Sequence, residues 1–115
     1  MKKRKNIITV AIDSGAAAGA GTVAKSIAKH FNLFYLDTGK IYRFLGKLKD
    51  NKKKKFTYSL IKKKVKELKI KDLANKSLLS DKIAVRASII AKDKKIRKLV
   101  YNFQTNCAYN PPKKY

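Results

Sequence analysis

A segment rich in glycine and alanine constrains the fold of this chain more than any other feature. Residues 7–12, which precede it, are apolar and mostly β-branched, a composition typical of a strand buried on both faces. Residues 13–21 then hold three glycines and four alanines. After them, apolar side chains recur at every fourth position from Val23 to Phe31, and Thr22 is suited to begin this helix. The sequence therefore predicts a strand, a glycine loop and a helix in that order.

This order of elements can bind phosphate. Successive backbone N–H groups of such a loop form a concave nest, and the N-terminus of the following helix adds partial positive charge. Glycine is needed where a positive φ or a close phosphate leaves no room for a Cβ atom. Alternatively, the small residues serve only to pack the helix closely on the strand. The residues alone leave both interpretations open.

The next part of the chain repeats the alternation of strand and helix. Residues 33–36 form a second apolar run that ends at Asp37, and helical spacing follows from Ile41 to Leu48. We therefore expect an α/β fold, a three-layer arrangement with a parallel sheet flanked by helices. Only two strands are predicted, and a two-stranded parallel sheet cannot cover its own edges. We expect the chain to be truncated at its C-terminus.

The second half of the sequence predicts helices only. A short amphipathic helix runs from Ile61 to Leu68. Ser80 is a suitable N-cap for a helix with apolar residues at 83, 87 and 90, and Asp93 for one with apolar residues at 96, 99, 100 and 103. Pro111 and Pro112 prevent that last helix from continuing.

Four segments, in this order, resemble bacterial cytidylate kinases over nearly the whole chain. Residues 13–22 are similar to the P-loop G-x-x-x-x-G-K-G-T of nucleoside monophosphate kinases, and residues 37–43 to the motif D-[ST]-G-x-x-Y-R. Residues 87–97 match A-S-(x)8-R, and residues 103–112 resemble F-Q-R-x-F-A-x-x-P-P. The P-loop departs from the family at two positions: Ser14 replaces the first glycine, and Ala20 replaces the phosphate-binding lysine.

The resemblance implies transfer of the γ-phosphoryl group of ATP to CMP or dCMP, with Mg²⁺ as cofactor. It also implies three parts: residues 1–48 start the P-loop core, residues 49–92 form the insertion that binds the monophosphate, and residues 93–115 return to the core. The remaining core and the lid would be missing. The residues that the resemblance assigns to the ATP phosphates are Gly15, Ala16, Ala17, Ala18, Gly19, Ala20, Gly21 and Thr22, and Thr22 would also contact Mg²⁺.

The resemblance assigns a second group of residues to CMP and to catalysis. Those implied to bind the monophosphate are Thr38, Tyr42, Arg43, Ser88 and Arg97, and those implied to act in catalysis are Asp37, Arg43 and Arg97. Arginine suits this role because its planar guanidinium binds phosphate in a bidentate manner. Taken without the resemblance, Arg43 and Arg97 are equally explained as solvated helix charges, Thr22 and Asp37 as helix caps, and Tyr42 as a core residue.

The charge of the chain permits another class of partner. With 30 lysines and arginines against 7 acidic residues, the formal net charge is +23. Such a surface attracts polyanions, so nonspecific nucleic-acid binding is chemically feasible. No helix-turn-helix, paired zinc-ligand or aromatic RNA-binding pattern accompanies the charge. Two alternatives to the kinase stay open: an inactive nucleotide-binding fragment, favoured by Ala20, and a lysine-rich nucleic-acid-binding protein.

Several other classes are excluded by composition. The single cysteine, Cys107, and the single histidine, His30, rule out an intramolecular disulfide scaffold and disfavour a zinc site. No apolar stretch approaches the ~20 residues that span a bilayer. Asp13 interrupts the first apolar run too early for a signal peptide. We expect a cytoplasmic monomer without membrane contact.

Overall fold

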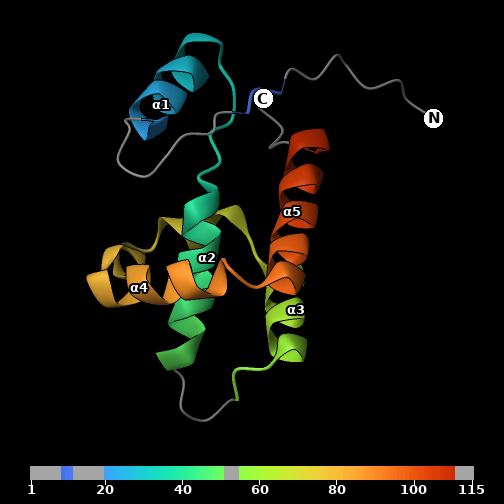
Figure 1. Ribbon diagram of the computed structural model, residues 1–115. Coiled ribbons are helices and arrows are strands. Elements are labelled where there is room, and N and C mark those ends of the chain that lie inside the picture. Colours follow the sequence, from blue (N-terminus) through green and yellow to red (C-terminus); the bar gives the residue numbers. More distant parts are fainter. Residues whose placement is uncertain (1–8, 12–19, 51–54, 111–115) are drawn as a thin grey trace, which may run out of the picture. The chain divides into compact units, whose positions relative to one another are not determined.

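The computed structural model describes residues 9–11, 20–50 and 55–110, and the regular elements of these residues are all helical (Figure 1). The described residues divide into two compact units, one up to Asp37 together with those from Thr105 on, the other from Thr38 to Gln104. The elements are α1 (Ala20–His30), α2 (Thr38–Lys47), η1 (Leu48–Asp50), α3 (Tyr58–Glu67), η2 (Ile70–Ala74), η3 (Lys76–Leu79), α4 (Asp81–Ile90) and α5 (Lys94–Tyr109), where η marks a 3₁₀-helix.

The predicted α/β fold with a parallel sheet is wrong for the described residues. The predicted strand at 33–36 forms no regular element, and neither do residues 9–11, the described part of the predicted strand 7–12. A strand exists only when its backbone groups pair with another strand, whereas a helix satisfies its own hydrogen bonds. Because no two segments pair in this way within the described ranges, residues 9–11 and 33–36 form no strand.

The first unit contains α1 and the segment that follows it. The helix confirms the predicted apolar repeat after Thr22. It ends at His30, and Asn32, two residues beyond, has a φ of 53° in the left-handed region that asparagine tolerates better than most residues. The next N–H, of Leu33, donates to the carbonyl of Ala28 at 2.7 Å, which satisfies one of the free carbonyls at the helix end.

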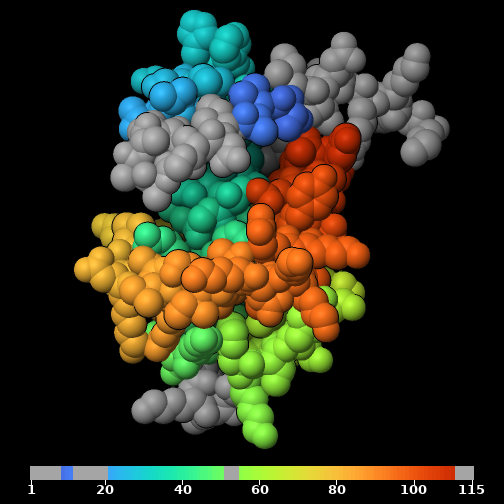
Figure 2. Space-filling view, viewed as in Figure 1, coloured from blue at the N-terminus to red at the C-terminus, as the bar shows by residue number. Residues whose placement is uncertain are grey.

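The second unit is held together by the crossing of α2 and α4. Figure 2 shows α4 lying across the middle of α2. Ile41 and Leu45 on α2 are fully buried, as are Leu78 and Val100. The two helix backbones approach closely at Gly46, where a Cβ atom would lie 3.1 Å from the Cβ of Arg86. The core of this unit therefore depends on a glycine at the crossing point.

Side-chain caps begin three of the helices in this unit. Ser80 Oγ accepts a hydrogen bond from the N–H of Ile83 at 3.3 Å, and Asp93 Oδ1 accepts one from Ile96 at 3.2 Å, so both predicted caps are confirmed. Thr57, which was not predicted as a cap, accepts from Leu60 at 3.2 Å and begins α3. These caps fix where the helices start and therefore which faces they bury. None of the helices in the described part of the chain is long and apolar enough to cross a membrane.

Candidate functional site

A basic hollow lies between α2 and α5 within the second unit. Its volume is about 400 Å³, which is within the range of small-molecule sites. Its lining residues are Tyr42 from α2 and Lys94, Arg97, Lys98, Tyr101 and Gln104 from α5. The α5 residues recur at intervals of three and four, so they share one face of the helix. The hollow combines three cations, two phenol rings and an amide.

The electrostatics of this hollow favour an anion. None of the described residues that line it is acidic, and α5 contains no acidic residue along its length. Lys94, Arg97 and Lys98 repel one another at these spacings, and they crowd the positive N-terminal end of the helix dipole. The nearest compensation in sequence is the N-cap Asp93, whose carboxylate already accepts hydrogen bonds from two backbone N–H groups. A bound anion would relieve this repulsion.

Tyr42 and Arg97, which are far apart in the sequence, interact directly in this hollow. Burial raises the pKa of the Tyr42 phenol above its usual range. Arg97 opposes that rise, because its positive charge and the hydrogen bond that it donates both favour the ionised phenol. The phenol and the guanidinium therefore lie within hydrogen-bonding range of each other.

The effect of Arg97 on the pKa of Tyr42 should be measurable by titration. Replacing Arg97 with methionine keeps most of the aliphatic bulk but removes the charge, so burial alone remains and the pKa of Tyr42 should rise further. Titration of ¹³C-labelled tyrosine followed by NMR would measure this shift. Lys62→Met, which removes an exposed charge from α3, should leave the pKa of Tyr42 unchanged. An unchanged Tyr42 pKa in Arg97→Met would contradict the contact.

The structure places the other predicted monophosphate ligands away from this hollow. Arg43 Nη1 donates a hydrogen bond to the carbonyl of Leu78 at 2.9 Å, which ties α2 to η3. Ser88 Oγ donates to the carbonyl of Val85 at 2.7 Å, one turn earlier on α4. Neither residue lines the hollow with Tyr42 and Arg97. Their contact with a monophosphate stays a prediction.

The remaining predicted residues lie at the start of α2 or in the first unit. Thr38 is the first residue of α2, and Asp37 precedes it as the last residue of the first unit's N-terminal segment. Burial and the neighbouring Asp37 carboxylate raise the pKa of Tyr35. Asp37 is thus close to an aromatic hydroxyl, and its role in catalysis stays a prediction.

The predicted phosphate loop is described only at its end. Gly15, Ala16, Ala17, Ala18 and Gly19 lie outside the described residues, while α1 begins at Ala20. Gly21 and Thr22 follow in the first turn of α1 and are exposed. The predicted contacts of this loop with ATP stay predictions.

Sequence reasoning missed four residues of the hollow and one structural arginine. Lys94, Lys98, Tyr101 and Gln104 could have been found from the spacing of basic and polar residues on a helix without acids. Arg86 joins α4 to the end of α2: it donates to the carbonyl of Gly46 at 3.4 Å and to the Asp50 carboxylate. This hydrogen bond is the main cause that lowers the pKa of Asp50.

Comparison with known proteins decides the family. The family model described as cytidylate kinase matches residues 10–113. The chain belongs to the cytidylate kinase family. It is 38% identical over 104 residues to the cytidylate kinase of Paramagnetospirillum magneticum, an alignment that covers 90% of this chain and 49% of the relative. It is 36% identical over 110 residues to that of Bartonella tribocorum, covering 90% and 48%.

A shorter match has a higher identity. The cytidylate kinase of Clostridium tetani is 53% identical over 45 residues, which cover 39% of this chain and 20% of the relative. The chain spans about half the length of the first two curated relatives. No solved structure matches it. Membership of the family confirms the resemblance that was inferred from the four motifs.

Proposed function

We propose that this chain serves the transfer of the γ-phosphoryl group of ATP to CMP or dCMP, giving CDP or dCDP and ADP. One observation carries the proposal: Tyr42 and Arg97, each marked by a different family motif, meet in a hollow whose described lining holds three cations and no carboxylate. The monophosphate of CMP is a dianion of suitable size and charge for such a hollow. This is the site that we assign to the phosphate acceptor.

In this proposal the chain contributes position and charge, and no covalent intermediate with the protein is needed. Arg97 binds the monophosphate, and the phenol of Tyr42 holds the guanidinium from the side that faces away from the phosphate. Lys94 and Lys98, one turn apart on the same face of α5, offset the charge that accumulates when two polyanions meet. Arg43 acts through its hydrogen bond to Leu78, which positions α2, so we assign it a positioning role in addition to the predicted contact.

We assign the donor of the phosphoryl group to the predicted phosphate loop and the first turn of α1. We propose that residues Gly15 to Gly21 hold the ATP phosphates and that the exposed hydroxyl of Thr22 is one ligand of Mg²⁺. A single hydroxyl fits this ion, because Mg²⁺ in kinases is commonly held by one or two protein groups, with phosphates and water completing its shell. The described residues contain no cluster of His, Cys, Asp or Glu that would hold a metal independently. Bound Mg²⁺ would neutralise charge on the transferring phosphates.

Calorimetry with CMP tests the acceptor site directly. We expect Arg97→Met to weaken CMP binding about thirtyfold, because a hydrogen bond to a charged group contributes about 2 kcal/mol. Lys62→Met is the matched control, since it removes one exposed positive charge from α3 without touching the hollow. It should change the affinity less than twofold. Equal losses in the two variants would show that only net charge matters and would contradict the site.

Activity and binding measurements on the same wild-type and variant proteins distinguish the kinase from the two alternative functions. Cytidylate kinase activity requires ADP release that depends on both CMP and Mg²⁺, with UMP and AMP as poorer acceptors. Binding of CMP and ATP without turnover would support the inactive nucleotide-binding fragment that Ala20 favours. If the chain is instead a nucleic-acid-binding protein, it should prefer some sequence by ~10³ or more, whereas incidental binding should only fall steeply with salt.

A further inference from the structure

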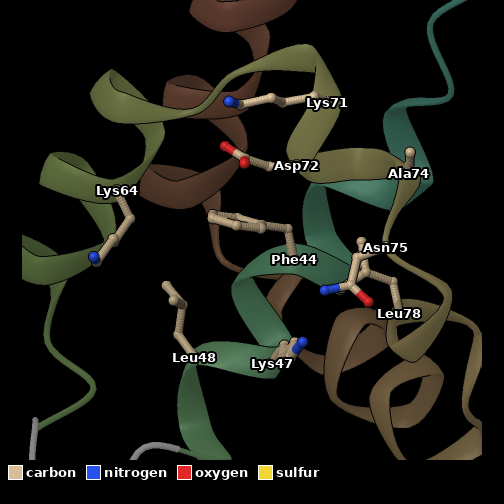
Figure 3. Close-up of a pocket in the computed structure, with 9 residues that line it drawn as sticks. All are labelled: Phe44, Lys47, Leu48, Lys64, Lys71, Asp72, Ala74, Asn75 and Leu78. Carbon is tan, nitrogen blue, oxygen red and sulfur yellow. The ribbon is translucent and has the colours of Figure 1, made fainter.

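A second hollow lies in the same unit, at a place that no family motif marks. It has a volume of about 620 Å³, which is within the range of small-molecule sites. Helices α2 and α3 form two of its sides, and η2 and η3 form the others (Figure 3). None of its lining residues lines the hollow between Tyr42 and Arg97. The two hollows are therefore separate sites.

One side of this second hollow is apolar. Leu48 and Leu78 line it, and Leu78 is fully buried. Figure 3 shows the ring of Phe44 projecting from α2 toward α3, between Leu48 and Asp72. The ring is only half-buried, so part of it is available for contact. An aromatic ring beside aliphatic groups offers a flat apolar surface on which another ring can stack.

The rim of the hollow carries a positive excess. Three lysines line it, Lys47, Lys64 and Lys71, against one acidic residue, Asp72. The Asp72 carboxylate already accepts a hydrogen bond from the N–H of Lys69 at 2.9 Å. The backbone N–H therefore offsets part of the negative charge of Asp72, and the three ammonium groups leave a net positive charge at the rim.

Among the residues that the structure describes, none forms a strong ion pair with these three lysines. Lys64 Nζ lies 4.0 Å from Glu67, and both side chains are partly exposed, so this pair is weak. Lys47 Nζ donates to the hydroxyl of Ser77 at 2.6 Å, a partner without charge. Lys71 is exposed and lies on the side of the hollow above Asp72 (Figure 3). These three ammonium groups can therefore bind a negatively charged ligand.

We infer that this hollow binds a small aromatic anion, a compound of one or two flat rings bearing a sulfonate, phosphate or carboxylate. The rings would stack on Phe44 and contact Leu48, while the acidic group would lie at the rim between Lys64 and Lys71. An apolar ligand would leave the lysines without a counterion, and an inorganic anion would leave the apolar side exposed to water. The combination of both surfaces selects a compound that has both properties.

The dye 8-anilinonaphthalene-1-sulfonate is a suitable probe, because it is aromatic and anionic and its fluorescence rises in apolar surroundings. We expect saturable binding of one dye per chain. Lys71→Glu should weaken it about tenfold, since the substitution replaces attraction at the rim by repulsion. Lys62→Glu makes the same change of charge on an exposed position of α3 outside the hollow. It should alter the affinity less than twofold.

Further measurements separate this site from the proposed CMP site and from general effects. Phe44→Leu keeps an apolar side chain but removes the ring, and it should lower both affinity and fluorescence gain. Arg97→Met and excess CMP should leave dye binding unchanged. Circular dichroism must show native helix content in each variant. Equal losses in Lys71→Glu and Lys62→Glu, displacement of the dye by CMP, or binding that never saturates would each overturn the inference.

Discussion

Gly46→Leu is expected to lower the free energy of unfolding of the Thr38–Gln104 unit by about 3 kcal/mol, near the upper end for overpacking. A Cβ atom at Gly46 would lie 3.1 Å from the Cβ of Arg86 and 3.4 Å from both the N of Ala87 and the O of Ile83. Two of these neighbours are backbone atoms of α4 and cannot rotate away. Leucine adds three more carbons in the same direction, so the helices must separate.

Urea denaturation followed by helical circular dichroism measures this loss, and a second glycine in the same helix supplies the control. Gly39 is exposed on α2. Gly39→Leu should raise stability by up to about 0.8 kcal/mol, because leucine has the higher helix propensity. The same substitution is thus expected to have opposite signs seven residues apart. If both variants were more stable than the wild type, the close crossing of α2 and α4 would be refuted.

The helices of this chain could be predicted from the sequence because their determinants are local. The caps Ser80 and Asp93 directly precede the helices that they begin, and the apolar repeat that follows each cap lies within its helix. The strand prediction failed at residues 33–36, because a run of apolar residues fits an unpaired segment as well as it fits a buried strand. Strand formation depends on pairing with distant residues, which periodicity does not reveal.

In the candidate site, too, the sequence predicted which residues take part but not the contacts that depend on distant elements. Family resemblance marked both Tyr42 and Arg97, and the structure brings them together. It also marked Arg43, whose guanidinium instead donates to the carbonyl of Leu78. The direction of a side chain on a helix depends on which elements pack around it. No motif in α2 specifies that η3 lies within reach of Arg43, so this contact could not be predicted.

Ala20→Lys is expected to raise the rate of CMP phosphorylation by a factor on the order of 10² to 10³, which is the usual effect of one donor to a transition-state charge. The prediction rests on the proposed function. Ala20 stands where the family has its phosphate-binding lysine, and it is the first residue of α1. A lysine there would place a positive charge at the helix end to which we assign the ATP phosphates. Release of ADP in the presence of ATP, Mg²⁺ and CMP measures the effect.

The alternative source of this charge is Lys25, five residues farther along α1. Its ammonium group lies 5.9 Å from the centre of the Tyr35 ring, so a cation–π contact already engages it. Lys25→Met should therefore leave turnover nearly unchanged, whereas a large loss would show that Lys25 replaces the missing lysine. If Ala20→Lys binds ATP as the wild type does but turns over no faster, the absent lysine does not limit the rate. The two variants change the charge of one helix by one unit in opposite directions, so a gain in Ala20→Lys without a loss in Lys25→Met would show that the position of the charge matters and not the net charge.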